Sequence, residues 1–224
     1  MRVCLLTGAS GLLGTHFINQ YADRYAIIAC QHEVGIRASG ATRTITADLR
    51  DYAAVTAMVI TAANAMGRID LVVNAAAVSL RRWHDPRTAL AHYVDVMAVN
   101  VAGTAWVTAA VAAICWQEPD EKARRSVVNV SSTSGHEVYD GEHDLAYPAS
   151  KAAVNMLTVH QAGELEAFGV RVNAVAPTSF PRLIPVGRVT EAIVSLDEGD
   201  ETGRILIIGR EGNCWLGDEA QPNS

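Results

Sequence analysis

The chain lacks closely spaced cysteines and any surplus of basic residues. Its cysteines are Cys4, Cys30, Cys115 and Cys214, and no two of them form a CxxC pair. A zinc site and a small disulfide scaffold are therefore disfavoured, and we expect reduced thiols, no bound metal and a cytoplasmic location. The formal net charge is −6, whereas a nucleic-acid-binding surface would need a basic patch or stripe.

Long uninterrupted apolar runs are missing too. The most apolar stretch, Val94–Trp116, contains Asn100 and Gly103, so we expect a buried helix rather than a membrane span. No charged and apolar leader precedes the first expected strand, and no Pro/Gly/Ser-rich linker divides the chain. We expect one domain over residues 1–216 and a flexible tail over 217–224.

Half of the residues are apolar (50%), and they recur as short runs separated by helical patterns. The runs predict strands at Val3–Thr7, Ala26–Cys30, Thr42–Thr46, Ile69–Asn74, Ser126–Ser131, Val170–Ala174 and Arg204–Ile208. Helices are expected at Leu12–Arg24, Ala53–Met66, Val94–Trp116, Tyr147–Phe168 and Val189–Leu196. Continuous Val/Ile/Leu runs are typical of parallel strands buried on both faces. The order predicts an α/β fold, a Rossmann-type doubly wound parallel sheet of about seven strands with helices on both faces.

The first expected strand ends in a glycine loop, TGASGLLG, over Thr7–Gly14. Gly8 permits a tight turn, Gly11 lets the backbone approach a pyrophosphate, and Gly14 allows close packing of helix on strand. The following helix would direct free amides and a partial positive charge at the phosphates. This spacing predicts a dinucleotide site, although a tight turn without a ligand is the alternative.

The end of the second expected strand bears on the choice of dinucleotide. An acidic residue there would favour NAD, because a carboxylate binds the ribose 2′-hydroxyl. The chain has Cys30–His32 at this place, with Glu33 just beyond and Arg37 and Arg43 further on. Cations suit a 2′-phosphate, so we favour NADP(H) over NAD(H), and Glu33 argues the other way.

Tyr147 and Lys151 form a YxxxK arrangement within AYPASK. Their spacing places both side chains on one face of a helix. A free tyrosine, with a pKa of roughly 10, is a poor base at neutral pH. A neighbouring ammonium favours the phenolate, so the pair could exchange a proton with a carbonyl or alcohol oxygen. An ordinary amphipathic helix face is the alternative interpretation.

Three further motifs accompany this pair. They are DLVVNAAA over Asp70–Ala77, VVNVSSTSG over Val127–Gly135, and GVRVNAVAP over Gly169–Pro177, and Asp48 stands within ADLRD. Together with the glycine loop and YxxxK, these motifs resemble the short-chain dehydrogenase/reductase family over nearly the whole chain. The resemblance implies an NAD(P)(H)-dependent oxidoreductase that interconverts a ketone or aldehyde and an alcohol.

The resemblance also implies roles for individual residues. Tyr147 would be the general acid/base, and Lys151 would lower its pKa and hold the nicotinamide ribose. Ser132 would polarise the substrate carbonyl, and Asn100 would support the long helix and join a proton relay. Ser134 is the rival of Ser132, because it has the more usual spacing to Tyr147.

A larger set of residues would bind the cofactor if the resemblance holds. They are Thr7, Gly8, Ser10, Gly11, Leu12, Leu13, Gly14, His32, Asp48, Leu49, Asn74, Ala75, Ala76, Tyr147, Lys151, Pro177, Thr178 and Phe180. Asp48 would contact the adenine.

The segment that follows the third motif departs from the family pattern. Only Thr178–Arg188 precedes the last expected helix, where the family usually has a long substrate lid. A short lid implies an open site, hence a bulky or carrier-tethered substrate, or a lid from a neighbouring subunit. Candidates to line the opening or contact substrate are Arg81, Arg82, Trp83, His136 and His143, and exposed loop positions are the alternative for each.

Two other functions fit the same motifs. One is an epimerase or dehydratase that recycles its cofactor internally. The other is a non-catalytic nucleotide-sensing regulator that keeps the fold. In the resembling family, helices corresponding to residues 94–116 and 147–168 form a dimer interface, so we expect a homodimer or homotetramer.

Overall fold

The computed structural model describes residues 1–33, 40–79, 86–120, 124–139 and 146–218. Arg37, Arg81, Arg82, Trp83 and His143, which the sequence singled out, lie outside these ranges. Within them an eight-stranded sheet has the order β3-β2-β1-β4-β5-β6-β7-β8. The strands are Arg2–Thr7 (β1), Tyr25–Gln31 (β2), Arg43–Thr46 (β3), Leu71–Asn74 (β4), Arg125–Val130 (β5), Val170–Pro177 (β6), Ile205–Ile208 (β7) and Asn213–Trp215 (β8).

The sheet is parallel except at its last strand, as the continuous apolar runs predicted. β8 pairs antiparallel with β7, and this short strand was not predicted. In the ladders Thr7 lies opposite both Cys30 and Asn74, and Asn74 lies opposite Asn129. The carboxyl ends of β1, β2, β4 and β5 are therefore nearly level. Ligands of open α/β sheets bind at this edge.

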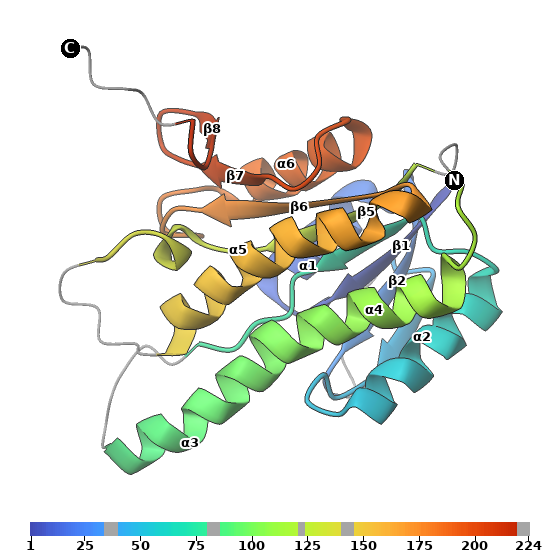
Figure 1. Cartoon of the computed structure of the whole chain (residues 1–224), viewed down its shortest axis with the longest axis horizontal. Helices are drawn as coiled ribbons and strands as arrows, with labels where there is room; N and C mark the ends of the chain where they lie inside the picture. Colours follow the sequence, from blue (N-terminus) through green and yellow to red (C-terminus); the bar gives the residue numbers. More distant parts are fainter. Residues whose placement is uncertain (34–39, 80–85, 121–123, 140–145, 219–224) are drawn as a thin grey trace.

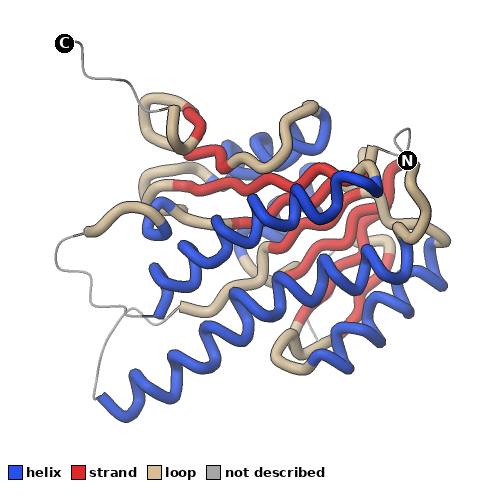
Figure 2. Tube along the Cα trace, viewed as in Figure 1, coloured by secondary structure: helices blue, strands red, loops and turns tan. Residues whose placement is uncertain are grey.

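Helices cover both faces of the sheet (Figure 1, Figure 2). They are Leu12–Tyr21 (α1), Tyr52–Met66 (α2), Pro86–Met97 (α3), Thr104–Cys115 (α4), Ala146–Leu165 (α5) and Val186–Glu198 (α6). α1 and α6 pack on one face, around Phe17 and Ile193. α2 and α4 pack on the other face, around Met58 and Trp116, with α5 beside them. The doubly wound fold expected from the sequence is confirmed.

The apolar helix is longer than the expected Val94–Trp116. α3, the π-helical segment Ala98–Gly103 (η1) and α4 follow one another without a break. The part over Leu90–Cys115 is long and apolar enough to cross a membrane, and 39% of its most apolar 18-residue stretch is buried inside the protein. Since α4 packs on α2 and Trp116 donates its indole N–H to the Ile69 carbonyl at 2.8 Å, we describe it as a core helix.

The end of the chain is held to the sheet as far as the structure describes it. Arg204 stacks on the Trp215 ring at 4.6 Å from the centroid and pairs with Asp218 at 2.5 Å. The tail expected over 217–224 therefore begins with two residues near β8, and its remainder lies outside the described ranges.

A buried carboxylate joins several elements at the amino edge of the sheet. Asp197, in the last turn of α6, is 2% exposed. It pairs with Arg2 at 2.7 Å and accepts hydrogen bonds from the hydroxyls of Tyr25 (2.9 Å) and Ser126. The partners come from β1, β2 and β5, so one carboxylate connects three strands with α6 on the side opposite the glycine loop.

We expect Asp197→Ala to lower the free energy of unfolding by about 3 kcal/mol, because it leaves the partly buried Arg2 and two buried hydroxyls without this acceptor. Urea unfolding followed by circular dichroism measures this change. Asp200→Ala is the control, since its side chain is 94% exposed. Equal effects of the two substitutions would contradict the structural role of Asp197.

Candidate active site

The glycine loop packs directly on the end of β4. Gly8 has φ +68°, and a Cβ there would lie 2.7 Å from the Ala76 amide nitrogen. A Cβ at Gly14 would lie 2.6 Å from Ala9 Cα. Side chains at these two positions would force the turn open or push α1 off the strand. The turn and packing roles predicted for these glycines thus have a steric basis in the structure.

The start of α1 has no side-chain cap. Gly11 is the residue before the helix, and no side chain accepts a hydrogen bond from the amides of the first turn. Four amides at a helix N-terminus lack partners within the helix. The partial positive charge and these amides suit a phosphate, so the loop could hold a dinucleotide's pyrophosphate.

A cavity of about 390 Å³ extends from this loop along the ends of β2, β3 and β4. Nine of the predicted cofactor residues line it: Thr7, Gly8, Ser10, Gly11, His32, Asp48, Leu49, Ala75 and Ala76. Cys30, Gln31, Ala47, Arg50, Ala77, Val78, His92, Asp95 and Val99 complete its lining. Its position, at the glycine loop and along the ends of three strands, fits a dinucleotide.

The other predicted cofactor residues lie elsewhere. Leu13 is buried in the core and Phe180 packs against it. The Asn74 amide donates to Thr108 and Asn129, at 3.1 and 2.9 Å, behind the sheet end. Leu12, Gly14, Tyr147, Lys151, Pro177 and Thr178 also do not line this cavity. Their contacts with a cofactor stay predictions.

Arg50, absent from the expected site, organises one end of the cavity. Its guanidinium contacts Asp48 at 2.7 Å and Asp95 of α3 at 3.3 Å. Hydrogen bonds from the side chain and the backbone amide of Arg50 lower the pKa of Asp48 to about 2. Asp48 is therefore ionised and already bound by a cation, while it lines the cavity as expected.

Tyr147 and Lys151 lie in the first turns of α5. The Lys151 ammonium is 5.4 Å from the centre of the Tyr147 ring and donates to the Val130 carbonyl at 2.7 Å. Lys151 is 3% exposed, and its burial lowers its pKa to about 8. An ammonium beside a phenol favours the phenolate, which is the pairing that the motif predicted.

Asn100 lies in η1 and connects this helix to the end of β4. Its amide accepts from the Val78 N–H at 2.8 Å and donates to the Val78 carbonyl at 3.0 Å. The same amide donates to the Ser150 hydroxyl at 3.0 Å, which in turn donates to the Tyr147 carbonyl at 2.7 Å. Asn100 is fully buried, so it positions both the strand end and α5. The sequence analysis did not single out Ser150, although it lies inside AYPASK.

Ser132 and Ser134 lie close together after β5. The Ser132 hydroxyl accepts from the Ser134 amide at 3.2 Å and donates to the Ser134 hydroxyl at 3.3 Å. Ser132 precedes the 3-10 turn Thr133–Gly135 (η3), which packs on α5. A Cβ at Gly135 would lie 2.7 Å from the Lys151 carbonyl carbon. This glycine, which the sequence showed only as the end of SSTSG, brings the serines beside Lys151.

His136 follows this turn and is partly covered. Its side chain is 14% exposed, and Nε2 is 3.5 Å from the Glu137 carboxylate. Within the described part of the chain, neither ring nitrogen has a hydrogen-bond partner. His136 is therefore not a fully solvated loop residue. Its contact with substrate stays a prediction.

The sequence profile of the short chain dehydrogenases matches residues 2–181. The chain belongs to the short-chain dehydrogenase/reductase family. It is therefore an NAD(P)-dependent oxidoreductase, as the motifs implied. Galactitol 2-dehydrogenase (L-tagatose-forming) of Cereibacter sphaeroides is 34% identical over 182 residues, which cover 77% of this chain and 68% of that protein. D-threitol dehydrogenase of Mycolicibacterium smegmatis is 31% identical over 217 residues, 84% of this chain and 80% of that protein.

Solved structures of this family share the fold. The Pseudomonas aeruginosa RhlG/NADP active-site complex superimposes with a TM-score of 0.81 at 23% identity, over 93% of this chain and 95% of that chain. A Brucella ovis oxidoreductase in complex with a partially ordered NAD gives a TM-score of 0.77 at 26% identity, over 93% and 99%. Relatives thus bind either NADP or NAD.

Lys151 gives this dehydrogenase/reductase a pH-dependent stability. Burial lowers its pKa from 10.5 to about 8, so the folded chain penalises the ammonium. The penalty is present below about pH 8 and is relieved as the pH rises towards the ordinary pKa of the unfolded chain. Relative to Lys151→Met, the wild type should gain up to about 3 kcal/mol of unfolding free energy between these pH values.

Urea unfolding of both chains at about pH 7.5 and about pH 10 measures the difference. Met156→Leu, an uncharged change on an exposed position of α5, should behave like the wild type at both pH values. A stability difference between wild type and Lys151→Met that does not change with pH would show that Lys151 has no lowered pKa.

Proposed function

We propose that the enzyme reduces a ketone or aldehyde to an alcohol, or catalyses the reverse, with Tyr147 as general acid/base. The observation that carries this proposal is the buried Lys151 ammonium 5.4 Å from the Tyr147 ring. The pair begins α5 next to the serines that follow β5. The relatives' names, galactitol 2-dehydrogenase and D-threitol dehydrogenase, support an alcohol and carbonyl pair as substrate and product.

The residues in and around the start of α5 have distinct tasks in this proposed reaction. A nicotinamide cofactor, held by the glycine loop and the cavity residues, would supply the hydride for reduction of the carbonyl carbon or accept it in the reverse direction. Ser132 holds the substrate oxygen, and Tyr147 gives that oxygen a proton during reduction. Lys151 stabilises the resulting phenolate. Asn100 keeps α5 in place through Ser150, so that the phenol stays in register with the bound substrate.

The short connection between β6 and α6 bears on how the substrate enters the site. We infer an open site that admits a bulky or carrier-tethered substrate, or one completed by a neighbouring subunit. Ile184 in this connection is fully buried, so the segment is anchored to the body of the protein. The expectation of NADP(H) from the sequence rests on Arg37, which lies outside the described residues, and on Arg43 in β3.

Tyr147→Phe removes the phenolic oxygen, so carbonyl-dependent NAD(P)H consumption should fall at least about a thousandfold. The assay follows absorbance of the reduced cofactor against a panel of ketones and aldehydes. Tyr52→Phe is the control, because Tyr52 is exposed on α2 and should leave turnover unchanged. Unchanged turnover in Tyr147→Phe would overturn the assigned role.

The same assay separates the two other functions. An epimerase or dehydratase would retain its cofactor and show no net consumption while its substrate is converted. A nucleotide-sensing regulator would bind NAD(P)H and turn over none of the panel. The Lys151 ammonium beside Tyr147 favours the reductase, since a regulator has no need of an activated phenol.

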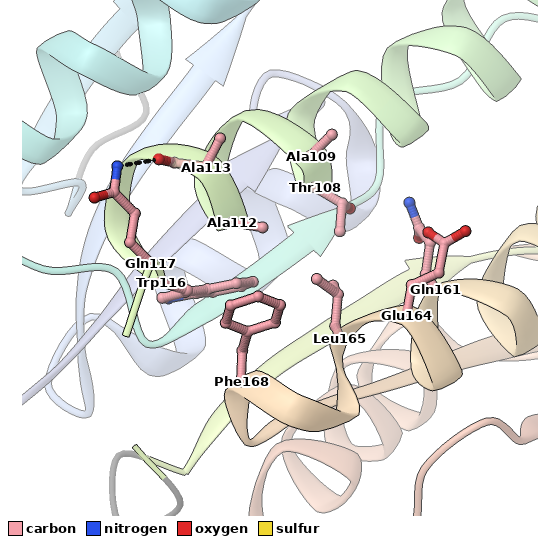
Figure 3. A pocket seen from close by; sticks show the side chains of 10 residues that line it. All are labelled: Thr108, Ala109, Ala112, Ala113, Trp116, Gln117, Gln161, Glu164, Leu165 and Phe168. Atoms are coloured by element: carbon pink, nitrogen blue, oxygen red, sulfur yellow. Dashed lines mark hydrogen bonds between the residues drawn. The ribbon is translucent and has the colours of Figure 1, made fainter. Parts of the chain in front are cut away.

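We also propose a homodimer, or a homotetramer, formed through α3–α4 and α5. Leu90 and Val94 are 70% and 65% exposed, and Met156 and Val159 on α5 are 58% and 44% exposed. Between α4 and α5 lies a largely apolar hollow of about 510 Å³, away from the glycine loop (Figure 3). Exposed apolar faces on neighbouring helices are typical of subunit contacts.

Val94→Asp should shift the enzyme towards monomers, because it places a charge in the proposed contact. Size-exclusion chromatography with light scattering measures the mass at micromolar concentration. Val138→Asp is the matched control, since Val138 is 97% exposed and lies outside these helices. A monomeric wild type, or a Val94→Asp variant of unchanged mass, would contradict this interface.

We infer a cytoplasmic location from the thiols. All four cysteines are free, and burial raises the pKa of Cys30 to about 12. Unpaired cysteines are typical of proteins in reducing compartments.

A further inference from the structure

The cavity contains a buried amide oxygen that no protein group satisfies. Gln31 ends β2, lines the cavity and is 5% exposed. Its Nε2 donates to the Glu33 carbonyl at 2.8 Å, which fixes which end of the amide is the oxygen. Among the residues that the structure describes, none donates a hydrogen bond to the oxygen Oε1. Buried acceptors are normally paired, so this one is suited to a donor from a ligand.

The place of Gln31 in the sheet indicates which part of a dinucleotide it meets. In dinucleotide-binding folds, the pyrophosphate lies at the glycine loop and the adenosine ribose lies beyond the end of the second strand. β1 and β2 end level, since Thr7 lies opposite Cys30. Gln31 is the next residue of β2 and lines the cavity, which places it at the end where the ribose would lie.

The charges around this end do not suit a phosphate. Among the described residues that line the cavity, Arg50 is the one arginine or lysine. It is engaged by Asp48 at 2.7 Å and by Asp95 at 3.3 Å. The three groups together carry a net negative charge. A 2′-phosphate would meet two carboxylates and a guanidinium that is already neutralised.

Arg43, one of the cations that suggested NADP(H), lies too far down the sheet. It pairs with Ile28, whereas Gln31 pairs with Thr46. Three residues of strand separate these levels, or roughly 10 Å. The guanidinium stem thus starts well below the edge where a ribose would lie.

We propose that Gln31 is a specificity residue, whose Oε1 accepts a hydrogen bond from the adenosine 2′-hydroxyl and selects NAD(H) over NADP(H). A hydroxyl is a donor and satisfies the oxygen, whereas a phosphate at this position offers only acceptors. This inference rests on the proposed function, since it requires a dinucleotide in the cavity. It is opposite to the preference for NADP(H) expected from the sequence.

Calorimetric titration with NAD⁺, NADP⁺ and the analogue of NAD⁺ that lacks the adenosine 2′-hydroxyl tests the proposal without turnover. The wild type should bind NAD⁺ at least about tenfold more tightly than either of the other two ligands. Gln31→Met keeps the length of the side chain and removes the acceptor. In this variant NAD⁺ and the 2′-deoxy analogue should bind with nearly equal affinity.

Gln20→Met is the matched control, because Gln20 lies on the exposed side of α1 and should leave all three affinities unchanged. Tighter binding of NADP⁺ by the wild type, or a 2′-hydroxyl effect that survives in Gln31→Met, would overturn the proposal and leave the proposed function intact. If none of the dinucleotides binds to the folded wild type, the proposed function fails and the inference fails with it.

Discussion

The close contact between the glycine loop and the end of β4 is the constraint on which the site depends. Gly8 lies so near the backbone of Ala75 and Ala76 that a Cβ would come within 2.7 Å of the Ala76 nitrogen. The Thr7 hydroxyl accepts from both amides at 3.2 Å. This close contact and the two hydrogen bonds hold the carboxyl ends of β1 and β4 at the same level. The resulting edge lines the cavity of about 390 Å³.

From this edge a set of hydrogen bonds reaches α5. Val78 follows β4 and is held through both of its backbone groups by the Asn100 amide. Asn100 also holds Ser150, which bonds to the Tyr147 carbonyl. The path crosses a π-helical segment, which is a frequent feature of functional sites. Because the groups of this path are largely buried, the cavity and the Tyr147–Lys151 pair are held in one relative position.

The fold could be predicted because it follows from local patterns: apolar runs gave the strands and 3.6-residue periodicity gave the helices. The sequence did not reveal a very short strand, the start of one helix, or a contact between residues far apart in the chain. β8 has only three residues and little apolar signal. The expected helix began at Val94, eight residues after the observed start at Pro86, although proline is typical of the first position of a helix. Arg50 could not be placed in the site, since Asp95 lies 45 positions along the chain.

The connection from β6 to α6 decides how substrate reaches Tyr147. Thr178 still follows the ladder, because its amide donates to the Ile208 carbonyl at 3.1 Å. Phe180 then packs against the core, and Ile184 is fully buried before α6 begins at Val186. A segment fastened at these points cannot also arch over the cofactor as a long lid would. Under the proposed function, the described part of this connection would leave closure of the site to the substrate's own bulk or to another subunit, which links the proposed oligomer to the proposed chemistry.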